Sequence, residues 1–151
     1  MNMDKIKKKL SRKANNCKES IKADAEEFLC ILYPAMQHLN KIDRMEGPAH
    51  DMKLAALAMI GHFNVAYRCP EARLENIQLM FADYAQLNSM FILCARQGLF
   101  YESERFNLAS RIERMEEGID KWHSAVTSAQ RQVGGKVGFF GDNEARVHPQ
   151  D

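Results

Sequence analysis

Residues 21–42, IKADAEEFLCILYPAMQHLNKI, decide the fold that the sequence predicts. Their apolar residues recur at alternating steps of four and three, which is typical of one stripe of a helix packed at a shallow angle: Ile21, Ala25, Phe28, Leu32, Ala35, Leu39 and Ile42. Pro34 interrupts this segment, because it removes an amide donor and presses its ring on the carbonyl of Cys30, at about 3 kcal/mol in a helix interior. A helix that stops near Tyr33 and restarts is the alternative. Since the stripe continues on both sides of Pro34, we expect one kinked helix over about 20–43.

Turn and cap residues divide the rest of the chain into three more periodic segments, at about 49–68, 71–97 and 103–132. Two prolines open the first two of these segments, a glycine ends the second, and a serine begins the third as its N-cap: Pro48, Pro70, Gly98 and Ser103. The pair Gly134-Gly135 is expected to close the last one. No alternating β-branched run precedes these glycines, so strands are not expected in the body of the chain.

These segments predict an all-α protein, an up-down-up-down antiparallel four-helix bundle in a single domain. A length of 151 residues with 46% apolar residues suits one domain with a substantial core. We assign residues 1–19 to a basic, flexible N-terminal arm, 20–133 to the bundle and 134–151 to a disordered C-terminal tail.

Charge is distributed unevenly along the chain. Residues 1–22 contain eight Lys or Arg against Asp4 and Glu19, a net charge of +6, and since the whole chain carries +1, the remainder carries −5. A basic arm before a mildly acidic body suggests contact with a polyanion, although a solvated run of charges is the commoner explanation of such a tract.

The second and third predicted helices are almost free of charge. Residues 54–67 contain no Asp, Glu, Lys or Arg, and residues 77–95 contain only Asp83. A helix on the surface of a monomer needs a polar face, and charged residues are depleted where protein surfaces pair. The sequence therefore predicts a homo-oligomer, with a monomer that has a weakly polar side as the alternative.

The sequence offers little for catalysis or metal binding. The four cysteines are scattered, and Asp120-x-x-His123 is a single copy of a motif that a di-iron bundle needs twice. No Gly-x-Ser-x-Gly elbow is present, and Gly134-Gly135-Lys136 follows a predicted helix rather than the strand that a phosphate-binding loop requires. We expect a protein that is not an enzyme and has no catalytic residue, metal or cofactor. Reduced thiols, the lack of a secretory signal and the lack of a bilayer-length apolar run favour a cytoplasmic location without a membrane partner.

Binding is the remaining class of function. The candidate residues for a nucleic acid or another polyanionic partner are basic residues of the arm and of the predicted helix ends: Lys5, Lys7, Lys8, Lys9, Arg12, Lys13, Arg68, Arg73, Arg96, Arg105 and Arg111. In an oligomer these modest patches would repeat around the symmetry axis. The alternative is that the arginines pair with surface glutamates, for example Arg111 with Glu104, and contribute little.

The segment Phe28-Leu29-Cys30-Ile31-Leu32-Tyr33-Pro34-Ala35-Met36-Gln37, followed by the charge-free second helix and by a last helix that contains Trp122, suggests a family. Over about residues 26–126 the chain resembles the accessory variability determinant (Avd) of diversity-generating retroelements. It also resembles the related four-helix-bundle proteins encoded in intervening sequences of bacterial 23S ribosomal RNA genes. The first resemblance implies a non-enzymatic pentameric barrel that binds the retroelement's reverse transcriptase and template RNA and supports mutagenic cDNA synthesis.

One departure from the family concerns charge. Such proteins are typically strongly basic, with arginines on the third helix, whereas this chain has Gln86, Asn88 and Ser89 there. The family's nucleic-acid surface therefore does not transfer residue by residue, and the arm from Lys5 to Lys22 would have to supply the charge. The second resemblance implies an alternative function, a structural oligomeric bundle with general nucleic-acid binding and no polymerase partner.

Overall fold

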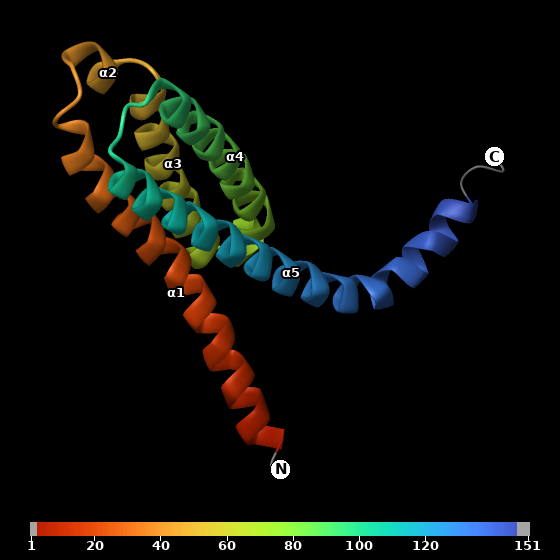
Figure 1. Cartoon of the computed structure of the whole chain (residues 1–151). Helices are drawn as coiled ribbons and strands as arrows, with labels where there is room; N and C mark the ends of the chain where they lie inside the picture. The colour runs from red at the N-terminus through yellow and green to blue at the C-terminus, as the bar shows by residue number, and fades with distance from the viewer. Residues whose placement is uncertain (1–2, 148–151) are drawn as a thin grey trace.

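The computed structural model describes the backbone of residues 3–147 and, within that range, the side chains of residues 3–5 and 20–131. This part of the chain is all-α and contains no strand, as the sequence predicts (Figure 1). The elements are α1 (Met3–Met36), α2 (Lys41–Met45), α3 (Pro48–Arg68), the single 3₁₀ turn η1 (Pro70–Ala72), α4 (Arg73–Gln97) and α5 (Glu102–Val147). None of the described helices is both long and apolar enough to cross a membrane.

The predicted kinked helix over 20–43 is wrong, because α1 ends two residues after Pro34. Gln37 closes the last turn, since its backbone N–H donates to the carbonyl of Pro34 (3.1 Å) and its side-chain amide donates to that of Tyr33 (3.2 Å). A short new helix, α2, then begins after Asn40, whose side chain accepts from the N–H of Asp43. Pro34 has no N–H to donate to the carbonyl of Cys30, and α1 ends within one turn after this missing bond. The expected burial of Ile42 fails with it, and that side chain is 71% exposed.

Both boundaries of α3 and the end of α4 agree with the turn residues of the sequence, whereas Pro70 opens η1 and α4 begins three residues later, at Arg73. Pro48 is the first residue of α3, after Gly47 in a positive-φ conformation (φ 92°). Gly98 ends α4 at φ 65°, where its N–H donates to the carbonyl of Ala95 and the next N–H, that of Leu99, donates to Cys94. This pair of bonds is a Schellman motif, which satisfies carbonyls that a helix end leaves free.

The fourth long helix begins earlier than predicted. Its N-cap is Tyr101 rather than Ser103, because the carbonyl of Tyr101 accepts the first helical bond, from Arg105 (2.9 Å). The carboxylate of Glu104 accepts the N–H of Tyr101 (2.9 Å), which is the carboxylate half of a capping box. A serine N-cap is the signal that the sequence pattern favours. In the structure the capping hydrogen bond instead joins the backbone N–H of Tyr101 to the carboxylate of Glu104, three residues later.

The predicted end of this helix near 132 is also not where α5 ends, since α5 continues to Val147. Glycine in a helix costs about 1 kcal/mol relative to alanine and does not forbid it, and the next proline is Pro149. The side chains of residues 132–147 and all of residues 148–151 lie outside the described part, and the domain boundaries at 19 and 134 stay predictions.

The four long helices enclose one apolar core. Contacts join α3 to α4, α1 to α5, α4 to α5 and α1 to α3, so each long helix packs against two others. The predicted stripes supply the core, and the largest fully buried side chains are Phe28, Ile21, Leu32, Met52, Met59, Ile77, Met80, Leu87, Leu108, Met115 and Ile119. This arrangement buries one stripe of each long helix and leaves the outward stripes exposed.

Candidate functional site

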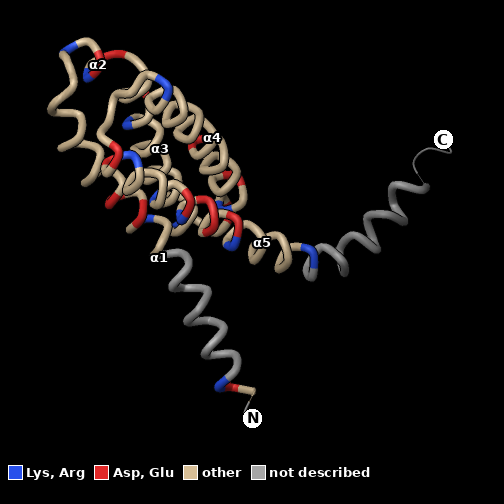
Figure 2. The backbone as a smooth tube through the Cα atoms, viewed as in Figure 1, with Lys and Arg blue, Asp and Glu red and all other residues tan. Residues whose placement is uncertain are grey.

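The outward stripes of α3 and α4 form a surface without charge, which we call the α3–α4 face. In Figure 2 the middle of both helices is almost entirely uncharged, whereas α5 carries many acidic and basic residues. The face consists of exposed apolar, small and uncharged polar residues: Leu54, Leu57, Gly61 and Val65 on α3, and Leu79, Ala82, Ala85, Gln86, Ser89, Ile92 and Leu93 on α4. Several are large and apolar, such as Leu54 (47% exposed) and Ile92 (45% exposed). Such a patch on a protein surface commonly marks an interaction site.

One ionisable pair lies at the contact between these two helices. His62 of α3 approaches Asp83 of α4, with Nδ1 2.5 Å from Oδ2, and the two side chains are 31% and 14% exposed. Asp83 is the one charged residue of 77–95, and His62 lies within the charge-free stretch 54–67. The two helices therefore neutralise their isolated polar groups against each other, which avoids leaving either group partly buried without a partner.

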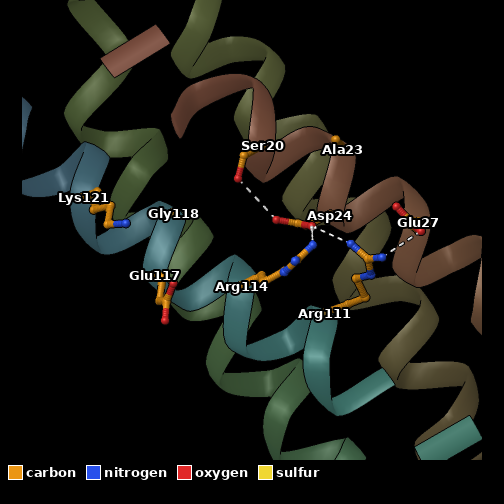
Figure 3. Close-up of a pocket in the computed structure, with 9 residues that line it drawn as sticks. All are labelled: Ser20, Ala23, Asp24, Glu27, Arg111, Arg114, Glu117, Gly118 and Lys121. Carbon is orange, nitrogen blue, oxygen red and sulfur yellow. Dashed lines mark hydrogen bonds and ion pairs between the residues drawn. The ribbon is translucent and has the colours of Figure 1, made fainter. Parts of the chain in front are cut away.

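A cavity of about 420 Å³ lies between α1 and α5, lined by three cationic and three acidic side chains (Figure 3). Asp24, nearly buried, is its centre: it accepts from Arg111 (3.1 Å) and from the hydroxyl of Ser20 (3.3 Å). The second terminal nitrogen of Arg111 donates to Glu27 (2.8 Å), and Arg114 approaches Asp24 at 3.9 Å. Charges of both signs thus compensate within this cavity, and it fastens α1 to α5.

A second cavity, of about 320 Å³, lies between α1 and α3, and we call it the α1–α3 pocket. Its lining combines two cations, an acid, an amide and two aromatic rings: Lys22, Glu26, Asn64, Arg68, Phe63 and Tyr67, with Ala23. Phe63 is buried and stacks on Tyr67, with ring centroids 5.8 Å apart and planes 18° apart. Lys22 pairs with Glu26 across one turn of α1 at 3.7 Å. The pocket therefore presents a half-exposed aromatic ring beside positive charge.

The candidate residues that the sequence names do not form one site. Arg68 is exposed at the end of α3 and lines the α1–α3 pocket, while Arg73 donates to the carbonyls of Ala66 and Tyr67 and so caps that helix. Arg96 lies in the last turn of α4, about 35 Å from Arg73 along the helix. Arg105, half-buried, is in the first turn of α5 on that same end. The predicted basic surface is thus divided between the two ends of the bundle.

Among the remaining candidate residues, the structure describes the side chains of Lys5 and Arg111 but not those of the other basic residues of the arm. Lys5 is exposed, whereas the side chains of Lys7, Lys8, Lys9, Arg12 and Lys13 lie outside the described residues. Arg111 pairs with Asp24 and Glu27 rather than with Glu104, the partner named from the sequence. Glu104 instead bonds His38, at 2.9 and 3.1 Å from Nε2, while the His38 ring stacks on Tyr101 at 4.4 Å. Binding by these residues stays a prediction.

Sequence reasoning missed most residues of these cavities, including Asp24, Tyr67 and Lys22. Asp24 and Tyr67 lie outside the apolar stripes and belong to no motif, so only the packing of α1 against α5 and α3 reveals them. Lys22 was counted only as part of the basic arm. The signal that points to Tyr67 is an i, i+4 aromatic pair with Phe63, which places both rings on one side of a helix.

Among the described residues, Tyr84 and Cys94 have clearly perturbed acidity, and Tyr84 lines a small pocket between α4 and α5 with Glu113 and Glu116. Burial raises the pKa of Tyr84 to about 12, and its hydrogen bond to Glu116 (2.9 Å) acts in the same direction. Burial also raises the pKa of Cys94 to about 12, with a smaller effect from the charge of Asp43. Cys94 is buried, whereas Cys30 is exposed. Among the described side chains no group of three or more His, Cys, Asp or Glu is placed to hold a metal.

Comparison with models of known protein families and with curated proteins found no match to this chain.

Proposed function

We propose that this chain is a non-enzymatic accessory protein of a diversity-generating retroelement, which self-assembles and holds the reverse transcriptase and template RNA together during mutagenic cDNA synthesis. The proposal includes an up-down-up-down bundle, a cytoplasmic location and, by family resemblance, a pentamer. The resemblance over about residues 26–126 supports the family, the α3–α4 face supports assembly, and the basic arm supports RNA binding.

The observation that carries the assembly is the composition of the α3–α4 face. Its residues follow a second set of heptad-like steps on each helix, separate from the steps that form the core. Small residues alternate with large apolar ones there, among them Gly61 and Ala82. A side chain as large as Leu57 packs well against a facing glycine or alanine, as in other helical interfaces. A second copy of the chain is the partner for which this self-complementary pattern is suited.

Native mass spectrometry at micromolar concentration, with light scattering, tests the assembly. We expect a homo-oligomer for the native chain and a shift toward the monomer for Ala82→Glu, because it places a charge in the centre of the face. Ala125→Glu on α5 is the matched control, since Ala125 is also an exposed helical alanine. A native chain that is a single species at monomer mass would refute the assembly.

Co-purification tests the accessory role. We expect the chain to retain both the reverse transcriptase encoded beside its gene and that element's template RNA. Deletion of residues 1–16 should weaken RNA binding and reduce the slope of affinity against salt, because it removes six basic side chains from the chain. An oligomer that retains RNA of many sequences but no reverse transcriptase would favour the alternative, a structural bundle of the ribosomal intervening-sequence type.

A further inference from the structure

The α1–α3 pocket combines groups that recognise a nucleotide. Its volume of about 320 Å³ is at the lower end of the range for ligand pockets, about 300–1,000 Å³, which suits one small planar ligand. The lining offers a flat ring, an amide and one cation from α3 and a second cation from α1. A nucleotide likewise has a flat base, polar base edges and an anionic phosphate.

Tyr67 is held as a platform. Phe63 stacks behind it with nearly parallel planes, and Phe63 in turn contacts Trp122 at 5.5 Å. Phe63 and Trp122 are buried, while Tyr67 is 52% exposed. This row of rings fixes Tyr67 from the core side and leaves part of it accessible in the pocket. Unstacked bases bind to aromatic side chains of this kind, whatever their sequence.

Positive charge flanks the platform. Among the described residues Arg68 has no carboxylate partner, unlike Arg111, and it follows Tyr67 directly in the chain. Lys22 faces it from α1 with its side chain 44% exposed, and the carboxylate paired with Lys22, that of Glu26, is itself 54% exposed. Lys22 is also the last basic residue of the tract that makes residues 1–22 strongly positive.

We propose that the α1–α3 pocket binds one unstacked base of a single-stranded RNA on Tyr67, with the neighbouring phosphate between Lys22 and Arg68 and the Asn64 amide at the base edge. The inference rests on the proposed RNA-binding function and names its contact on the folded body. An acidic peptide of the protein partner would bind the two cations but has no flat group to stack on the Tyr67 ring. Single-stranded RNA has a base to stack on the ring and a phosphate to bind the cations.

Fluorescence anisotropy with a short labelled oligouridylate and the full chain tests the proposal. We expect Tyr67→Ala to weaken binding about tenfold, within the range for one stacked base, and Tyr67→Phe to restore it. Arg68→Ala should lower the salt slope by about one. Glu26→Gln should strengthen binding, because it frees Lys22 from its carboxylate. Quenching of a 2-aminopurine in the same strand should disappear in Tyr67→Ala.

Matched controls lie elsewhere on the bundle. Tyr33→Ala removes an exposed tyrosine of α1, and Arg131→Ala removes an exposed arginine of α5, and neither residue lines the pocket. Circular dichroism checks that each variant is folded. Equal affinities of the native chain and Tyr67→Ala, in a protein that binds RNA, would overturn the pocket and leave the proposed function intact. Absence of RNA binding by the native chain would overturn both. Displacement of the RNA by polyglutamate, with a peptide affinity that depends on Tyr67, would assign the pocket to a peptide and overturn the inference.

Discussion

His62 of α3 and Asp83 of α4 are hydrogen-bonded across two helices that otherwise carry almost no charge, with Nδ1 2.5 Å from Oδ2. The hydrogen bond offsets the free-energy cost of removing each group from water in its partly buried position. The pair forms at the register in which α3 packs on α4, and each helix offers one such group in its uncharged part. Register in turn decides which residues align on the α3–α4 face.

We expect Asp83→Ala to lower the free energy of unfolding by about 1–3 kcal/mol, because it leaves the His62 imidazole partly buried without its acceptor. Urea denaturation followed by circular dichroism measures the change. Asp120→Ala, at an exposed carboxylate of α5, should change stability by less than about 0.5 kcal/mol. In a double-mutant cycle His62→Ala should add little once Asp83 is replaced, and full additivity would contradict the coupling.

Arg111 and Arg114 approach the same carboxylate but differ in what they contribute. We expect Arg111→Ala to cost about 2 kcal/mol, because nearly buried Asp24 loses its 3.1 Å partner and Glu27 loses its bond as well. Arg114 is 60% exposed and 3.9 Å away, so Arg114→Ala should cost less than about 0.5 kcal/mol. Thermal denaturation of the two variants compares them, and equal costs would show that Asp24 is not the anchor of α1 on α5.

Tyr84 makes stability depend on alkaline pH. Its pKa is raised from 10.0 to about 12, first by burial and then by its hydrogen bond to Glu116, so the folded state favours the neutral phenol. The stabilising contribution is therefore fully present below pH 10 and is lost as the pH rises toward 12. Urea denaturation at several alkaline pH values should show a steeper fall for the native chain than for Tyr84→Phe. Parallel curves for the two proteins would remove Tyr84 as the cause.

Substitution by alanine should have opposite effects on stability at Gly61 and at Gly98. Gly61 lies inside α3 with open space where a Cβ would stand, so Gly61→Ala should raise the stability of the isolated fold by about 1 kcal/mol. Gly98 has the same open space but a φ of 65°, so Gly98→Ala should cost about 1–2 kcal/mol. Denaturation under conditions that keep the chain monomeric separates helix propensity from any effect on assembly. A stabilised Gly98→Ala would show that the left-handed cap is not required.

Some of these features can be recognised from the sequence pattern, and others cannot. The charge-free stretches of α3 and α4 can be recognised in the sequence, because a long run without Asp, Glu, Lys or Arg is itself a pattern. The α1–α3 pocket is not, because Lys22 and Tyr67 are 45 positions apart and nothing local in either segment refers to the other. The His62–Asp83 pair is intermediate: each residue stands out within its own uncharged segment, but the contact depends on the register of the two helices.

What the sequence by itself determined is the all-α class, the apolar stripes and the breaks at Pro48, Pro70 and Gly98. These depend on periodicity and on backbone restrictions, which act within a few residues of the chain. Only the tertiary structure decided where α1 ends after Pro34, which acids neutralise Arg111, and which end of the bundle receives each basic residue. Apolar residues at heptad spacing can occur on both sides of a helix break, so the spacing alone does not locate the break. The partners of an ion pair depend on how helices that are distant in the sequence pack together.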